Sequence, residues 1–307
     1  MKTSRLILTC ILLTFVAALP AMAGPRIFVS GLGNDANPGT REQPKRTFAS
    51  ALTVTDPGGE VVVLDPAGFG SSPLTITKSV SIIVPPGIFG GIRVPLGNAI
   101  TVAAGANDTV ILRGLTLNSG GGDAGIEFQS GAALQIENCI INAFTFYGVH
   151  IAAPGNIYIK DTLVRNSGFY GVVFGSGAGT VRGTIEHCRV ENNKAAGLVL
   201  RNNSTLFVRD SVVSGNGQAG PVGNFDGVRV EATTADLTLE NCLVSGNAGS
   251  GLYVGPGTAR ISSSTFVKNG GYGLENHQST LESRGNNTVR ANGAGIAFGA
   301  VDPIPGL

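Results

Sequence analysis

The sequence predicts an all-β protein, a solenoid of the parallel β-helix type with three short strands in each turn of about 23 residues. A short pattern recurs along the chain: an apolar strand ending in a charge, a small polar corner, a second short strand, an Asn, and then Gly-apolar-x-apolar. Self-similarity at a fixed period of this size is characteristic of solenoids. The composition agrees, because 46 Gly accompany strands rich in Val, Ile and Leu, as many short strands joined by tight turns require.

The corner residue gives the register of the repeat. Its successive positions are Leu115, Cys139, Thr162, Cys188, Ser211, Cys242, Ser264 and Asn287, with spacings of 24, 23, 26, 23, 31, 22 and 23. Period-two alternation places the residues three before and two after each corner inside the solenoid. Since each repeat leaves no room for a helix, every strand must pair in parallel with its equivalent one turn along.

Residues 1–23 have the features of a cleaved signal peptide. Lys2 and Arg5 form a positive region, Leu6 to Leu19 is the apolar core, and Ala21-Met22-Ala23 is a small-x-small cleavage site. We expect cleavage after Ala23 and a secreted or periplasmic protein. The apolar run is too short to be a good membrane span, so no membrane insertion is expected. A net charge of +1 and the absence of Trp argue against a nucleic-acid partner.

The repeats resemble the right-handed parallel β-helix proteins of the pectin-lyase-like superfamily over most of the chain after residue 23. The segment FVSGLGNDANPGTREQPKRTFASAL, residues 28–52, is similar to the start of family 9 pectate lyases. There a strand and a Gly-x-Asp-x-x-x-Gly-Thr turn lead into a short capping helix; Lys45 departs from the aromatic residue usual in that family. The resemblance implies a strand, turn and capping helix in residues 24–59 and the β-helix in residues 60–307, as one domain.

Thr47 is a good N-cap for the expected helix, and Phe48, Leu52 and Val54 are expected to cover the first coil.

Three outward or corner columns are interpreted as structural ladders. The position two before the corner reads Arg113, Glu137, Lys160, Glu186, Arg209 and Glu240, an exposed alternation of charge that would pin the register. The position one before the corner reads Asn138, Asp161, His187, Asp210, Asn241, Ser263 and Asn286, side chains that suit a sharp bend. The position five after it reads Asn193, Asn216, Asn247, Asn269 and Asn292, similar to the stacked asparagines of the superfamily.

The cysteines Cys139, Cys188 and Cys242 share one inward column. Successive members are two turns apart, or roughly 9.6 Å, whereas a disulfide needs Cα atoms within about 7 Å. We therefore expect three free, buried thiols that act as small hydrophobic residues.

Two candidate binding surfaces remain on the strand that follows the recurring Gly. The first combines Arg201, Arg229, Glu231, Tyr253, Glu275 and His277, with Phe225 and Asp226 at its edge, where the longest repeat inserts residues 217–226. The second combines Glu127, His150, Tyr147 and Tyr170. Tyr rings offer flat platforms for sugar rings. Both surfaces predict a polysaccharide or cell-surface glycan as partner.

Catalytic motifs of the superfamily are missing from the sequence. Calcium-dependent pectate lyases need converging carboxylates and a Lys or Arg base, and polygalacturonases use paired Asp motifs and a Gly-His-Gly. We therefore expect binding without turnover, and no metal or cofactor. The alternative is a polysaccharide lyase or glycoside hydrolase that uses Arg229, Glu231, Glu275 and His277, with Ca²⁺ only in the lyase case. A second alternative is a structural or adhesion scaffold that self-associates at the uncapped C-terminal end, residues 300–307.

Overall fold

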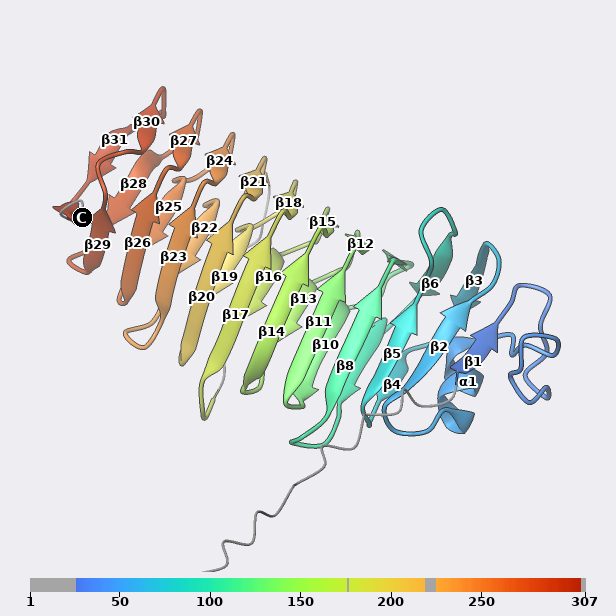
Figure 1. The fold of residues 1–307 in the computed structure, drawn as a ribbon. Helices are drawn as coiled ribbons and strands as arrows, with labels where there is room; N and C mark the ends of the chain where they lie inside the picture. The colour runs from blue at the N-terminus through green and yellow to red at the C-terminus, as the bar shows by residue number, and fades with distance from the viewer. Residues whose placement is uncertain (1–25, 176, 219–224, 305–307) are drawn as a thin grey trace, which may run out of the picture.

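The computed structural model describes residues 26–175, 177–218 and 225–304, which form an elongated all-β solenoid of three parallel sheets (Figure 1). The single helix of these residues lies at one end of the rod and the C-terminus at the other. The sheets are called A, B and C below. Along the chain, each turn contributes one strand to sheet A, then one to sheet B and one to sheet C, and each strand pairs with its equivalent one turn along. The predicted fold class is confirmed. The predicted signal peptide and its cleavage site lie outside the described residues.

Sheet A holds twelve of the described strands and carries the predicted charge ladder. They are β1 (Arg26–Val29), β2 (Gly59–Val63), β5 (Val80–Ile83), β8 (Thr109–Arg113), β11 (Ala133–Glu137), β14 (Gly155–Lys160), β17 (Val181–Glu186), β20 (Ser204–Arg209), β23 (Asp236–Glu240), β26 (Thr258–Ser262), β29 (Thr280–Ser283) and β32 (Asp302–Pro303).

Sheet B follows each corner and consists mostly of three-residue strands. They are β3 (Ala67–Gly70), β6 (Gly90–Val94), β9 (Leu115–Ser119), β12 (Ile140–Asn142), β15 (Leu163–Arg165), β18 (Arg189–Glu191), β21 (Val212–Ser214), β24 (Leu243–Ser245), β27 (Thr265–Val267) and β30 (Thr288–Arg290).

Sheet C contains the strands that follow the recurring Gly. They are β4 (Leu74–Ile76), β7 (Ile100–Ala103), β10 (Ala124–Ser130), β13 (Tyr147–Ile151), β16 (Tyr170–Phe174), β19 (Leu198–Leu200), β22 (Val228–Val230), β25 (Leu252–Val254), β28 (Tyr272–Asn276) and β31 (Gly295–Phe298). Among the described residues, no helix is long and apolar enough to cross a membrane.

The solenoid interior is one continuous apolar core built from the predicted inward columns. The column three before the corner, Leu112, Ile136, Ile159, Ile185, Val208, Leu239 and Ile261, is fully buried. Strand pairing stacks these residues directly, as in the pairs Leu112 with Ile136 and Ile136 with Ile159. The alternation predicted from the sequence therefore holds from β8 to β26.

The residues one before each corner adopt the left-handed backbone conformation that their short polar side chains predict. Asn138, Asp161, His187, Asp210, Asn241 and Ser263 have φ between 48° and 53°. Few residue types other than Asn, Asp and Gly enter this region readily. His187 thus has the same structural role as the rest of this column, and its Nε2 lies 3.8 Å from Asp210 Oδ2 of the next turn.

The predicted asparagine ladder is present, and all of its members except the last, Asn292, are buried. The amide Nδ2 of Asn193 donates to Oδ1 of Asn216 at 2.9 Å, and Asn216 donates in the same way to Asn247. The ladder continues through Asn269 to Asn292. Each amide also accepts a backbone N–H from the preceding turn, as Asn216 Oδ1 does from Asn193 N. Buried amides are thereby satisfied, as buried polar groups must be.

The cysteine column alternates with hydroxyl residues, and the three cysteines are free and buried as predicted. Thr162 lies between Cys139 and Cys188, and Ser211 lies between Cys188 and Cys242. The backbone N–H of Cys139 donates to Thr162 Oγ1 at 3.2 Å, and that of Cys188 donates to Ser211 Oγ at 3.1 Å. Burial raises the pKa of the Cys139 and Cys188 thiols to about 12.

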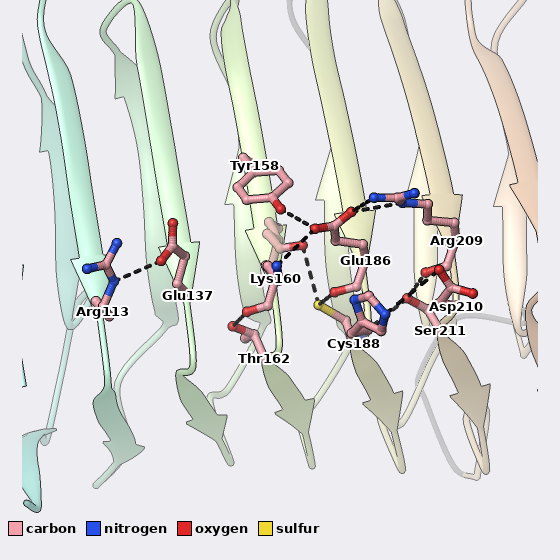
Figure 2. Close-up of polar contacts among 12 residues, drawn as sticks. Arg113, Glu137, Tyr158, Lys160, Thr162, Glu186, Cys188, Arg209, Asp210 and Ser211 are labelled. Atoms are coloured by element: carbon pink, nitrogen blue, oxygen red, sulfur yellow. Dashed lines mark hydrogen bonds and ion pairs between the residues drawn. The ribbon is translucent and has the colours of Figure 1, made fainter. Parts of the chain in front are cut away.

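The outward charge ladder of sheet A has the predicted register, and Figure 2 shows its contacts. Arg113 Nε lies 2.8 Å from Glu137 Oε2, and Lys160 Nζ lies 3.5 Å from Glu186 Oε1. Arg209 also pairs with Glu186.

The prediction that the whole ladder is exposed is wrong at Glu186, whose side chain is only 5% exposed. The Tyr158 hydroxyl donates to Glu186 from the neighbouring strand β14 (Figure 2). This bond and the Arg209 guanidinium hold the pKa of Glu186 at about 2. The Glu186 carboxylate is therefore ionised at neutral pH and is held by its contacts with Tyr158 and Arg209.

The helix α1 (Phe48–Val54) begins as predicted, with Thr47 as N-cap. Thr47 Oγ1 accepts the Ser50 N–H at 3.1 Å, and Asp35 Oδ1 accepts the N–H of Thr47 at 2.9 Å. Lys45, which stands where an aromatic residue is usual in the resembling family, is buried and donates from Nζ to the Asp35 carbonyl at 2.8 Å.

The helix covers the first coil with Phe48, Ala51 and Leu52, which are buried. The expectation that Val54 joins them is wrong, because Val54 is 42% exposed. A helix turns once in about 3.6 residues, so positions 48, 51 and 52 share one face and position 54 does not.

The buried thiols should resist chemical modification in the folded protein. Because the thiolate is the reactive form and burial raises the thiol pKa, we expect a disulfide reagent to react slowly with Cys139, Cys188 and Cys242 under native conditions and with all three in denaturant. The measurement is thiol titration with time. Rapid labelling of any of the three in the native protein would contradict this register.

Glu186 should make stability depend on acid pH. Its pKa lies below its ordinary value of 4.5, so its contribution is present above pH 4.5 and is lost as pH falls toward about 2. We expect Glu186→Gln to lower the free energy of unfolding by about 2 kcal/mol at neutral pH, with the difference shrinking below pH 4.5. Urea unfolding over a pH series measures it.

The matched control for this experiment is Glu240→Gln, because Glu240 is an exposed member of the same ladder. It should change stability by about 0–1 kcal/mol. A difference between wild type and Glu186→Gln that stays constant down to pH 2 would contradict the assignment.

Candidate functional site

Both predicted surfaces lie along the outer face of sheet C, and one column of residues runs through both of them. Strand pairing aligns, in order, Glu127, His150, Val173, Val199, Arg229, Tyr253 and Glu275. Each of these residues alternates with buried ones, as Glu127 does with Ile126 and Phe128. The structure therefore places all of them on the outside of the solenoid.

The first surface is organised around the guanidinium of Arg229, which is only 12% exposed. Arg229 donates to Asp226, its Nε lies 3.0 Å from Glu231 Oε1, and its Cζ lies 3.9 Å from the centroid of the Tyr253 ring. Arg201 Nε lies 3.3 Å from the other oxygen of Glu231. These contacts hold two arginines and two carboxylates in fixed positions.

Asp226 lies inside this cluster rather than at its edge, and it is buried. Its Oδ1 accepts the Ser250 N–H at 2.6 Å. Burial raises the pKa of Asp226, and the nearby Glu275 charge adds to this effect, against the opposing influence of Arg229. Phe225 precedes it and is half-buried, so the last two residues of the long insertion enter the surface at the start of β22.

The far end of the first surface pairs an acid with an imidazole. His277 Nε2 lies 2.7 Å from Glu275 Oε1, and the Ser250 hydroxyl donates to the other oxygen of Glu275. The Tyr253 and His277 ring centroids lie 5.0 Å apart. Phe298 continues the row, with its ring centroid 5.2 Å from that of His277.

The second surface, nearer the N-terminus, repeats the grouping of a carboxylate, an imidazole and a tyrosine ring. His150 Nδ1 lies 2.9 Å from Glu127 Oε2, and the Tyr147 ring centroid lies 4.7 Å from that of His150. The Tyr147 and Tyr170 rings are stacked, with centroids 6.2 Å apart and planes 9° from parallel.

Arg201 joins the two surfaces, because its Cζ lies 5.4 Å from the Tyr170 ring centroid. Between them, Val173 and Val199 point outward yet are fully buried, in a small cluster with Tyr170, Ala195 and Ala196 outside the main core. The joined surface is called the outer band below. It consists of Glu127, Tyr147, His150, Tyr170, Arg201, Phe225, Asp226, Arg229, Glu231, Tyr253, Glu275 and His277, on or beside the seven neighbouring strands from β10 to β28.

The sequence interpretation missed two aromatic residues beside the outer band. Phe146 is 40% exposed, and its ring centroid lies 5.6 Å from that of Phe169. Each precedes one of the stacked tyrosines, so the rings of two Phe and two Tyr gather at this end of the band. The signal was present in the sequence, because Phe-Tyr-Gly-Val occurs at residues 146–149 and again at 169–172.

Arg229 is the cation at the centre of the outer band. Burial alone would lower the pKa of Arg229, but the charges of Asp226 and Glu231 outweigh it and raise the pKa above its usual value. Arg229 is therefore a charged anchor rather than a base. Within the described residues, no group of three or more His, Cys, Asp or Glu could hold a metal ion.

Solved structures similar to this chain share its fold at low sequence identity. The pectate lyase Pel9A is 15% identical over 89% of this chain and 80% of its own, with a TM-score of 0.68. An alginate lyase from Paenibacillus sp. str. FPU-7 is 15% identical over 83% of this chain and 95% of its own, with a TM-score of 0.61. The enzymatically active domain of tailspike protein 2 from bacteriophage CBA120 is 15% identical over 84% of this chain and 43% of its own, with a TM-score of 0.62. Among curated proteins, none matches this sequence.

A family described as the right-handed β-helix region matches residues 124–294, more than half of the chain. This match covers β10 to β28 and therefore the whole outer band. The similarity of the N-terminal segment to family 9 pectate lyases stays a prediction. The handedness that the resemblance implied is confirmed, and the chain belongs to the right-handed β-helix family.

Proposed function

We propose that this protein is exported after cleavage behind Ala23 and binds carbohydrate or cell-surface material through the outer band, without turnover. The observation that carries the proposal is the unbroken series of contacts between aromatic and charged side chains along one face. The similar structures include a pectate lyase and an alginate lyase, proteins whose names give polysaccharides as substrates.

The outer band has the two kinds of group that sugar recognition uses. Tyr rings present flat apolar faces with a polar edge, and carboxylates accept hydrogen bonds from hydroxyl groups. Because the ion pairs of Arg229 and Arg201 hold these side chains before a ligand arrives, binding would immobilise few of them. Such pre-organisation lowers the entropic cost of association.

The alternative, a polysaccharide lyase or glycoside hydrolase, is favoured by the two carboxylate–imidazole pairs. An imidazole oriented by a carboxylate can act as a general base. Glu127 with His150 and Glu275 with His277 both have this arrangement. Glu231 and Glu275, the other carboxylates of the catalytic hypothesis, lie on or beside strands two turns apart and are held by separate partners.

The scaffold alternative rests on the last coil. Ile296 is 64% exposed, and the neighbouring Phe298 is exposed as well. Self-association through this part of the solenoid stays a prediction.

Removing single rings from the outer band should weaken glycan binding. We expect Tyr253→Ala and Tyr147→Ala each to cost about 1–2 kcal/mol, or roughly tenfold in Kd. A glycan array identifies a ligand, and calorimetry then compares the variants. Phe207→Ala is the matched control, because Phe207 lies on the outer face of sheet A. Equal losses in all three variants, or none in the band variants, would count against the proposal.

Turnover assays separate the proposal from the catalytic alternative. We expect no release of reducing ends and no ultraviolet absorbance from unsaturated uronates when the protein is incubated with pectin, alginate and related polymers. Turnover that Arg229→Ala or Glu275→Ala abolishes would establish the enzyme instead. His150→Gln in the same assay would show whether the Glu127–His150 pair is the one that acts.

A further inference from the structure

We propose that the outer band takes glycans without carboxylates, neutral polymers of hydroxyl- and N-acetyl-bearing sugars, rather than polyuronates. This inference rests on the proposed function, because it names the ligand class of the same band. It departs from what the names of the pectate lyase and alginate lyase would suggest. Three features of the band support it. Its formal charge is negative, its two arginines are already paired with carboxylates of the protein, and its other groups are hydrogen-bond acceptors and aromatic rings.

The band has more negative than positive groups. It contains four carboxylates and two guanidinium groups, so with the imidazoles counted as neutral its formal charge is 2 − 4 = −2. The carboxylates extend along its whole length, from Glu127 at one end to Glu275 at the other. Like charges brought together across an interface oppose binding. A polyuronate lying along this face would place carboxylates beside carboxylates.

Both guanidinium groups already bind carboxylates of the protein. Arg229 is held by Asp226 and Glu231 on two sides and by the Tyr253 ring on its face. Arg201 is held by Glu231 and lies over the Tyr170 ring. A uronate would have to displace one of these partners to gain the bidentate contact that makes arginine a carboxylate receptor. The displaced carboxylate would then be left without its cation.

The groups that remain suit an uncharged sugar. An ionised carboxylate only accepts hydrogen bonds, and a sugar hydroxyl can donate them. Glu127 is partly exposed and, through His150, lies near Tyr147, on which a sugar ring could pack. Stacking on Tyr147 and Tyr253 requires an apolar ring face and no charge. A neutral glycan can therefore use both kinds of contact with no electrostatic cost.

The test compares oligosaccharides of equal length on the mature protein by calorimetry. Neutral probes are oligomers of glucose, mannose, galactose and N-acetylglucosamine, and anionic probes are oligomers of galacturonate and mannuronate. We expect at least one neutral probe to bind about tenfold or more tighter than either uronate at low salt, with added salt narrowing the ratio. Tighter binding of a uronate overturns this inference and leaves the proposed function standing. Binding of no probe overturns both.

Removal of band charge should change the selectivity. We expect Glu127→Gln and Glu275→Gln each to raise uronate affinity by about threefold or more relative to the neutral probe. The control is Glu240→Gln, which removes the same charge from the outer face of sheet A and should leave the ratio unchanged. An equal change in the control would assign the effect to the charge of the whole molecule and overturn the inference. If Glu275→Gln does not fold, Glu127→Gln carries the test alone.

Discussion

In-register parallel pairing of each strand with its equivalent one turn along is the constraint on which this structure depends. Adjacent strands lie about 4.8 Å apart, so the nearest neighbours of any side chain are the two residues of its own column. A buried polar column must therefore satisfy itself. The asparagine ladder does so, because Asn216 donates its amide to Asn247 and accepts from Asn193.

The same constraint acts differently on the two outer faces. On sheet A, opposite charges alternate along the column, and the contacts of Glu186 with Arg209 and Lys160 follow from that alternation. On sheet C, the column mixes aromatic, acidic, basic and apolar residues without such a rule. Surface ion pairs contribute little to stability. The central ion pair of the outer band, Arg229 with Asp226, is not of this exposed kind, because both side chains are largely buried.

The parts of the structure that depend on one column at a time could be predicted from the sequence. The inward columns, the left-handed corners at residues such as Asp161, and the free cysteines all follow from the period and the alternation. Contacts between residues of different columns could not be predicted in this way. The hydrogen bond to Glu186 comes from Tyr158, two positions away on the neighbouring strand, and the joining of the two surfaces depends on the reach of Arg201 to Tyr170. Both contacts depend on which rotamers the side chains adopt, and the alignment of the repeats gives no information on rotamers.

The position just before the recurring Gly shows how one backbone site supports different chemistry. Successive turns place there Tyr147, Tyr170, Ala196, Asp226, Ser250 and Tyr272. The backbone bonds of these turns are equivalent, as Gly171 N donates to the Ala196 carbonyl and Gly197 N to that of Asp226. The side chains supply stacking at one end of the band, a buried carboxylate in its centre and a hydroxyl beside Glu275. Since the solenoid accepts all of these without altering its pairing, the fold leaves the chemistry of this face undetermined, and the charges and rings of the outer band set that chemistry.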